Sequence, residues 1–362
     1  MSGVRLQGSC AVRWAVASAL GLLLLGSLGA APAGAAPRDR LVFIDGEERE
    51  VAGIIEEKVD EVRVRGGNPV PAQQLLTIVR AEVPPAYAQA EAAMRAGRYP
   101  VAIERFQAAL ADPNAPAWVG PWASAGLAEA LTRQAEGGEQ AAAGRAVDAW
   151  RRLMEAHPGH FLEPRALEGL GRALLAAGRA AEALETFGRL ADRRYGEYWE
   201  LKGKVGRGLA LMANRQFVEA LTEFEASSAA AARRPGLAEV YAAAQAGKGR
   251  TYMAKGDYDG AIRFYEEMAK RGEATSAQAA ADAFVNLARA YEQRGGEDDK
   301  RQALRVYMEV ALFYAGAPAA YAEALLRAGR LLEERGERER AAAYFRELKA
   351  RCPDSPQARQ VP

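Results

Sequence analysis

The chain has 362 residues, of which 48 are Lys or Arg and 47 are Asp or Glu, so its formal net charge at pH 7 is +1. This balance excludes a general attraction to nucleic acid or anionic membranes, because both require a strong basic excess or a clustered basic patch. Aromatic residues make up 8% of the chain, which argues against a large β-sandwich core, while abundant Ala, Arg and Glu favour helices.

The first 35 residues are typical of a targeting segment. Arg5 and Arg13 precede an apolar run from Ala15 to Leu28, and small residues follow up to Ala33-Gly34-Ala35. This pattern predicts a secretory signal peptide cleaved after Ala35, with an uncleaved membrane anchor as the alternative. We therefore expect an exported protein, periplasmic, in the cell envelope or secreted, with membrane contact only through an uncleaved signal segment.

Residues 36–84 favour short strands, and we call this segment the β-module. Leu41 to Ile44 leads into Asp45-Gly46, a strong hairpin signal because glycine tolerates the positive φ of tight turns. Further strands are predicted at Glu50 to Glu57, Glu61 to Arg65 and Leu75 to Arg80. Gly53 would permit a sharp bend. The layout resembles the small SH3-like or Sm-like barrels that precede repeat arrays in some bacterial envelope proteins. An irregular sheet packed against the first helices is the alternative.

After Pro84-Pro85 the pattern changes to helical periodicity, and one phrase recurs. "AGRYPVAIERFQAAL", "AGRAAEALETFGRL" and "KGDYDGAIRFYEEM" each combine a turn glycine with a helix. A small residue that lets two helices approach closely falls at Ala102, Ala146, Ala183, Ala220, Ala261, Ala303 and Ala341. Aromatic residues four positions later lie on the same helix face at Phe106, Phe187, Phe224, Tyr265 and Phe345. We therefore expect small and large side chains of neighbouring helices to interlock.

The helix before each phrase carries a matching mark, a glycine at Gly126, Gly171, Gly208, Gly249 and Gly329. Together these marks are similar to the tetratricopeptide repeat pattern, W-x2-L-G-x2-Y, then A-x3-F, then P, whose basic period is about 34 residues. The resemblance implies a mainly α protein: an α-solenoid of about seven helix pairs over residues 85–355, preceded by the β-module and followed by a polar tail over 356–362.

The repeats depart from the family pattern in spacing and in one turn residue. The spacing of the marks exceeds the basic period, so we expect extra residues to loop out, including between paired helices at Gln134 to Gly144 and Gly295 to Lys300. The fourth unit has Arg215 where other units have the turn glycine. The two ends of the array need covers, and we expect the β-module to cap the first pair and the C-terminal tail to cover the last.

The resemblance implies a non-enzymatic scaffold in the bacterial cell envelope that binds a protein or peptide in the concave groove of the superhelix. We expect no catalytic residue, cofactor or small-molecule substrate, because the sequence lacks a Walker loop, a G-x-G-x-x-G after a strand and a G-x-S-x-G elbow. The alternative is a structural or self-associating envelope or cell-surface element that acts through the β-module.

A metal site is not expected either. His157 and His160 are the only histidines, and we expect them in a solvated loop between repeats rather than in a metal site with Glu163. Removal of the signal peptide would leave Cys352 as the single cysteine, which excludes an intramolecular disulfide.

Four arginines are the candidate partner-binding residues: Arg172, Arg250, Arg289 and Arg330. Each follows the leading-helix glycine or its equivalent, a position that in the family tends to face the groove. Such a ladder would suit an acidic peptide or a C-terminal carboxylate, because guanidinium forms bidentate, charge-assisted hydrogen bonds. The alternative is that these arginines pair with the chain's own Glu292, Glu323 or Glu333.

Overall fold

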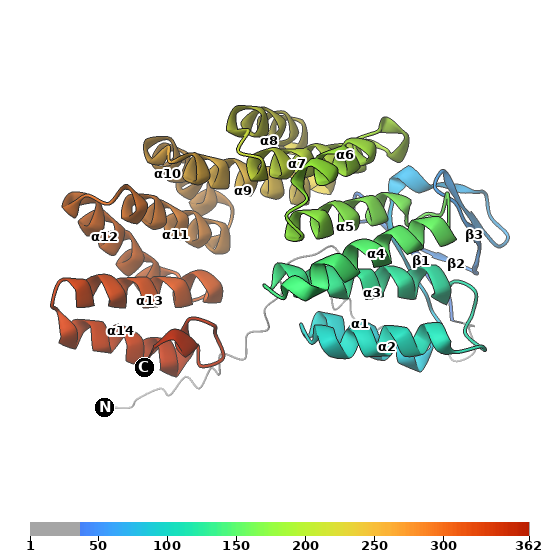
Figure 1. Ribbon diagram of the computed structural model, residues 1–362, viewed down its shortest axis with the longest axis horizontal. Coiled ribbons are helices and arrows are strands. Elements are labelled where there is room, and N and C mark those ends of the chain that lie inside the picture. The colour runs from blue at the N-terminus through green and yellow to red at the C-terminus, as the bar shows by residue number, and fades with distance from the viewer. Residues whose placement is uncertain (1–36, 362) are drawn as a thin grey trace. The chain divides into compact units, whose positions relative to one another are not determined.

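The computed structural model describes residues 37–361, apart from the side chains of residues 273–275 (Figure 1). The predicted signal peptide lies outside the described residues, and the division into four segments stays a prediction. The described residues form two compact units, 37–251 and 252–361, which we describe separately. Within the described part of the chain, no helix combines the length and the apolar character that a membrane span requires.

The β-module contains six strands in two antiparallel sheets. The strands are β1 (Asp39–Phe43), β2 (Glu48–Val51), β3 (Ile54–Glu57), β4 (Glu61–Val64), β5 (Val70–Pro71) and β6 (Leu75–Val79). One sheet has the order β2-β1-β6 and the other the order β3-β4-β5, with a 3-10 turn at Ala72–Gln74 before the last strand. The hairpin predicted at Asp45-Gly46 is confirmed, since Gly46 has φ 91° between β1 and β2.

One predicted strand, Glu50 to Glu57, is wrong as a single element. The chain changes sheets at Ala52-Gly53, so that β2 and β3 belong to different sheets. Gly53 has φ 153°, a conformation that residues with a side chain rarely adopt. The sequence pattern identified the residue that bends the strand but not the break in hydrogen bonding that follows.

Fourteen α-helices follow in the described residues, the number that seven helix pairs require. The first helix of each pair, which we call the leading helix, is α1 (Pro85–Arg95), α3 (Val119–Glu136), α5 (Glu163–Ala176), α7 (Glu197–Ala213), α9 (Ala238–Lys255), α11 (Ala277–Arg294) and α13 (Pro318–Glu334). The second, or trailing, helix is α2 (Tyr99–Ala111), α4 (Gln140–Ala156), α6 (Ala180–Leu190), α8 (Phe217–Ala231), α10 (Tyr258–Thr275), α12 (Glu297–Phe313) and α14 (Arg338–Arg351).

The loops predicted inside two of the pairs are absent. Helix α3 continues to Glu136 and α4 begins at Gln140, while α12 begins at Glu297, directly after Gly295-Gly296. The extra residues lengthen the helices because Ala, Gln and Glu are strong helix formers. Ala135, Ala142 and Ala143 also form a small buried cluster, so the extension of α3 and α4 gains packing of its own.

The aromatic ring of a trailing helix lies between glycines of two leading helices. A methyl group added at Gly171 or at Gly206 would overlap with the ring of Phe187, and Gly208 and Gly247 enclose Phe224 in the same way. The interlocking of small and large residues is thereby confirmed. Gly126 differs from its predicted equivalents, because the ring against it, Phe106, comes from the preceding pair.

The β-module does not cap the first helix pair. It lies along the loops that connect successive pairs, residues 112–118, 157–162, 191–196 and 232–237, which we call the loop edge. Arg80 lies over the ring of Trp118, Val59 N donates to Gly159 O at 2.8 Å, and a side chain at Gly196 would meet Gln73. Because strand and helix residues of 37–251 share one buried core, module and array are a single packed body.

The C-terminal tail covers the last helix pair, as expected. Cys352 and Ala358 are buried against Tyr321, Leu325 and Leu348, and a 3-10 turn forms at Ala358–Gln360. The tail thus supplies apolar contacts to α13 and α14 that an eighth pair would otherwise provide.

Candidate functional site

The leading helices form a shared face in each unit. In residues 37–251, α1 contacts α3, α3 contacts α5 and α5 contacts α7, and in residues 252–361 α11 contacts α13. No two successive trailing helices among the described residues are in comparable contact. Each stack is therefore tightest along its leading helices, which places them on the inner side of its curve.

Arg172 is on α5 and is neutralised by the chain itself. Its Nη1 lies 3.1 Å from Glu129 Oε2 and its Nη2 lies 2.8 Å from Glu136 Oε2, both on α3. Burial alone would lower the pKa of Arg172, but Glu129 and Glu136 outweigh burial and raise it. The first residue of the predicted ladder is thus held in a fixed ion pair between two leading helices.

The other three ladder residues lie in different surroundings. Arg250 Nε donates to Ala246 O at 3.3 Å within α9. Arg289 Nη2 lies 2.7 Å from Glu323 Oε1, one of the partners that the alternative interpretation named. Arg330 Nη2 donates to Gln360 Oε1 of the tail at 3.0 Å. Arg172 and Arg250 belong to residues 37–251, and Arg289 and Arg330 belong to residues 252–361.

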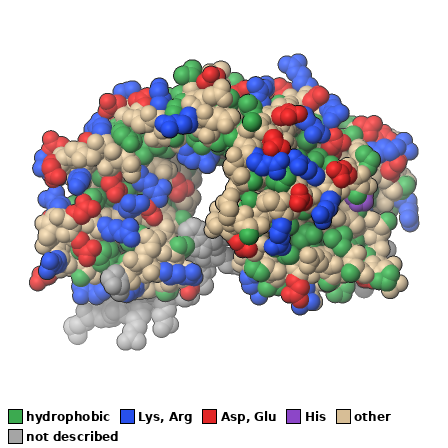
Figure 2. All heavy atoms as spheres, viewed as in Figure 1, with side chains coloured by type: hydrophobic (Ala, Val, Ile, Leu, Met, Phe, Trp, Pro, Cys, Tyr) green, Lys and Arg blue, Asp and Glu red, His purple; other side chains and the backbone are tan. Residues whose placement is uncertain are grey.

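Ion pairs continue across both leading faces. Lys202 Nζ on α7 lies 2.8 Å from Glu168 on α5 and 3.0 Å from Glu239 on α9. In residues 252–361, Arg327 forms two ion pairs, with Glu292 at 3.1 Å and with Glu323 at 3.0 Å. Burial would raise the pKa of Glu323, but hydrogen bonds from Arg289 and Gln357 lower it to about 2. On the face that Figure 2 shows, side chains of both signs are likewise intermixed over each unit.

A buried charge cluster joins the β-module to the array at Glu57. Trp122 Nε1 on α3 donates to Glu57 Oε2 at 2.7 Å, and Arg80 forms an ion pair with the same carboxylate. Arg80 also reaches Asp39 Oδ2 at 3.0 Å. The sequence pattern missed this cluster, because it assigned Trp122 to the repeat core and treated acidic pairs such as Glu56-Glu57 as solvated.

The histidine loop is not the solvated loop that we expected. Lys58 and His160 form an antiparallel bridge, and Leu162 N donates to His160 Nδ1 at 3.1 Å. His160 Nε2 lies 3.6 Å from Glu57 Oε2. Burial, with the nearby charges of His157 and Arg80, lowers the pKa of His160 to about 4, so the ring is neutral at pH 7. The loop is ordered because it extends the edge of the β3–β4 sheet.

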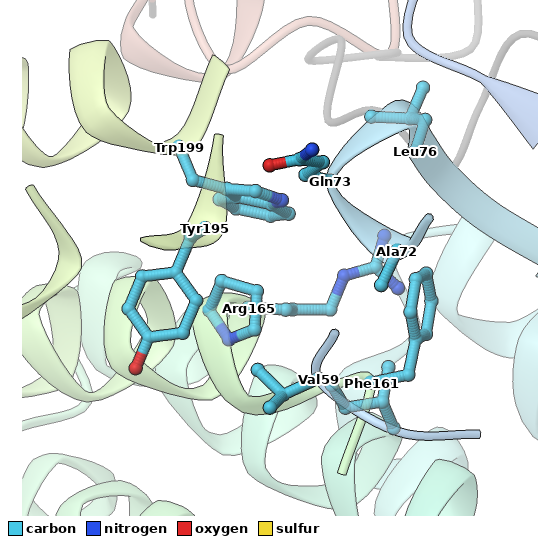
Figure 3. A pocket seen from close by; sticks show the side chains of 10 residues that line it. Val59, Ala72, Gln73, Leu76, Phe161, Arg165, Tyr195 and Trp199 are labelled. Atoms are coloured by element: carbon cyan, nitrogen blue, oxygen red, sulfur yellow. The ribbon is translucent and has the colours of Figure 1, made fainter. Parts of the chain in front are cut away.

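A small pocket lies where the β-module meets the third and fourth helix pairs (Figure 3). Residues of the module, the start of α5 and the start of α7 line it, among them Ala72, Gln73, Phe161, Arg165, Tyr195 and Trp199. The side chain of Arg165 runs across the pocket toward Ala72 and Phe161, while Gln73 and Trp199 lie on the opposite side (Figure 3). The space inside is about that of one water molecule.

The side chains that could hold a metal ion do not cluster. No group of three or more His, Cys, Asp or Glu residues with metal-binding geometry occurs within residues 37–361. Cys352, the one cysteine of this range, is buried beneath the tail.

Comparisons with known proteins agree with the repeat pattern. Family models described as tetratricopeptide repeat match residues 143–198, 246–275 and 323–355. A search of curated proteins found no significant match.

Solved structures with a similar arrangement include a tetratricopeptide repeat protein from Parabacteroides merdae, with 16% identity, 76% of this chain and 95% of that chain covered, and a TM-score of 0.47. Another is PilW, a type IV pilus biogenesis factor, with 19% identity, 76% and 96% coverage and a TM-score of 0.39. A third is NprR in complex with its peptide NprX, with 12% identity, 78% and 83% coverage and a TM-score of 0.42.

Two of the three matches, residues 143–198 and 323–355, contain a leading-helix glycine packed against an aromatic ring of the trailing helix, Gly171 on Phe187 and Gly329 on Phe345. The chain therefore contains tetratricopeptide repeats.

Proposed function

We propose that this protein is a non-enzymatic scaffold of the bacterial cell envelope that holds a partner polypeptide on the leading-helix face of its repeats. Repeat arrays of this kind present extended inner surfaces to other proteins. The observation that carries the proposal is the leading face of residues 37–251. There, half-buried side chains such as Glu129, Arg172 and Lys202 are held in place by one another. A surface whose charged groups are fixed before binding loses little side-chain entropy when a partner arrives.

The envelope location rests on the N-terminal sequence pattern alone. It is tested by expressing the full chain with a C-terminal tag and separating cytoplasm, periplasm and membranes. We expect the tagged protein to be shortened by about 35 residues and to occur in the periplasmic or membrane fraction. A full-length product confined to the cytoplasm would contradict it.

Partner binding is tested by capture from envelope extract with the chain lacking residues 1–35. A second bait has Arg172, Arg250, Arg289 and Arg330 all changed to Ala, with circular dichroism to check that helix content is unchanged. A partner captured by the first bait and lost from the second supports binding through the arginine ladder. A partner captured by both baits supports the scaffold and places the contact elsewhere. If neither bait captures a protein and the chain self-associates in size-exclusion chromatography, the structural alternative replaces the proposal.

A further inference from the structure

The pocket between the β-module and the third and fourth helix pairs contains an arginine without a partner. Most half-buried arginines of residues 37–361 pair with a carboxylate, as Arg172 does with Glu136 and Arg289 does with Glu323. Arg105 and Arg165 are the two half-buried arginines of this range for which the structure shows no hydrogen bond or ion pair. Of these two, only Arg165 lines a pocket.

The acidic residues nearest to Arg165 are already engaged. Burial raises the pKa of Glu91 and the charge of Arg165 only partly opposes this, while the carboxylate bonds to Tyr87 and lies 3.7 Å from Arg95. Glu168 also interacts electrostatically with Arg165, but its carboxylate forms an ion pair with Lys202 at 2.8 Å. The guanidinium therefore keeps its five N–H donors, which in a half-buried position require an acceptor from water or from a ligand.

The surroundings of Arg165 fit a small planar anion. None of its nitrogen atoms is among the fully buried atoms that lack a partner, so solvent reaches them. Phe161, Tyr195 and Trp199 supply apolar walls, which strengthen a charge-assisted hydrogen bond by excluding competing water. The space is about that of one water molecule, so it admits a single carboxylate oxygen while the rest of the ligand stays outside.

We infer that this pocket receives a carboxylate of the partner polypeptide, held by Arg165 between the β-module and the third helix pair. The inference rests on the proposed function, because it names the chemistry by which the partner is recognised. It also differs from the ladder hypothesis. Arg172 and Arg289 form ion pairs with the chain's own glutamates, whereas the guanidinium of Arg165 makes no ion pair or hydrogen bond within the described residues and lies at a site that includes Gln73 of the module.

The test uses the chain lacking residues 1–35 and three acetylated tripeptides. The first has two alanines and a leucine with a free C-terminal carboxylate, the second is its C-terminal amide, and the third is an amide with glutamate in the middle. Binding is measured by calorimetry and by tryptophan fluorescence, since Trp199 forms part of the pocket wall. We expect the free acid to bind about tenfold or more tightly than the first amide, as a charge-assisted hydrogen bond provides. Binding of the glutamate peptide would identify a side-chain carboxylate as a second source of the ligand group.

The matched variants are Arg165→Gln and Arg105→Gln, which remove one unpaired, half-buried guanidinium each. Arg165→Gln should weaken carboxylate binding by about tenfold or more, while Arg105→Gln leaves it unchanged. Equal binding of acid and amide, no binding of any peptide, or undiminished binding to Arg165→Gln would each overturn the inference.

Capture from envelope extract separates this inference from the proposed function. A partner held equally well by the unchanged chain and by Arg165→Gln would refute the role of the pocket and leave the scaffold intact. Absence of any partner would count against the scaffold, while the peptide titrations would still decide whether the pocket takes a carboxylate.

Discussion

The loop edge of residues 37–251 is covered by the β-module, whereas the corresponding loop of residues 252–361, 314–317, has no strand of its own unit against it. At the covered edge, Arg80 lies over the ring of Trp118, and Phe161 N donates to Glu57 O of β3 at 3.3 Å. The other unit leaves Leu312 and Phe313 exposed at 72% and 70%. Both units use the same helix packing and similar ion pairs on their leading faces, so the repeat pattern builds the array but does not decide what covers its edges.

The largest expected effect comes from breaking the junction at Glu57. Glu57→Ala leaves Arg80 buried with Asp39 alone and removes the acceptor of Trp122, so we expect the free energy of unfolding to fall by about 3–5 kcal/mol. Glu56→Ala is the control, because its pairs with Lys58 and Arg63 are exposed and should contribute less than about 1 kcal/mol. Urea unfolding followed by tryptophan fluorescence reports on residues 37–251, where all described tryptophans lie. Equal effects of the two variants would show that the junction is not a stabilising core.

The two units should lose stability in different pH ranges. In residues 37–251, His160 has a folded pKa of about 4 against 6.5 unfolded, so the unfolded chain binds more protons between these values. The contribution of neutral His160 to the free energy of unfolding is complete above pH 6.5. It is lost as the pH falls toward 4, with an upper limit of about 3 kcal/mol. His160→Asn keeps an acceptor for Leu162 N and should abolish this loss, whereas His157→Asn should retain it. An unchanged pH profile in His160→Asn would refute the assignment.

In residues 252–361 the titrating group is Glu323, whose folded pKa of about 2 lies below its ordinary 4.5. Its contribution is complete above pH 4.5 and is lost as the pH falls to about 2, again by up to about 3 kcal/mol. Far-UV circular dichroism includes this unit, which has no tryptophan. As the pH falls from 6 to 4.5, we therefore expect residues 37–251, followed by tryptophan fluorescence, to lose stability first. The helix signal of residues 252–361 should persist over this range. A simultaneous loss of both signals would contradict separate titration.

Helix packing inside residues 37–251 should respond less strongly than the junction. Gly206→Ala places a methyl group against the ring of Phe187 and should destabilise the protein by about 1–3 kcal/mol. Gly188→Ala, on α6 with open space around the added atom, should instead stabilise by up to about 1 kcal/mol through higher helix propensity. Urea unfolding of both variants measures the difference, and a loss of stability in Gly188→Ala would show that space at the glycine is not the deciding factor.

The smallest effect is expected at the turn of the fourth pair. Arg215 has φ 62°, a left-handed conformation that costs energy for a residue with a side chain. Arg215→Gly should stabilise the protein by less than about 1 kcal/mol, because the glycine also increases the freedom of the unfolded chain. The reverse change, Gly178→Arg at the turn of the third pair, should destabilise it, since Gly178 has φ 72°. Thermal unfolding of both variants is sufficient, and effects of the same sign would refute the interpretation.

The sequence by itself determined the seven helix pairs and the hairpin of the β-module. Ala183, Phe187 and Gly178 act within one or two helical turns, and their recurrence at similar spacing makes a local packing rule visible in the chain. It did not determine helix length at Gly137 or Gly295, because strong helix formers extended the helices where the repeat period predicted loops.

Only the tertiary structure decided where the β-module lies and which charges pair. Glu57 meets Trp122 from 65 positions away, and Arg172 meets Glu129 from 43 positions away. Such pairs occur once each and carry no period, so no pattern in the sequence indicates them. The same holds for Arg165, which lines a pocket without an ion pair of its own among the described residues. Its lack of a partner there depends on where the neighbouring carboxylates are directed.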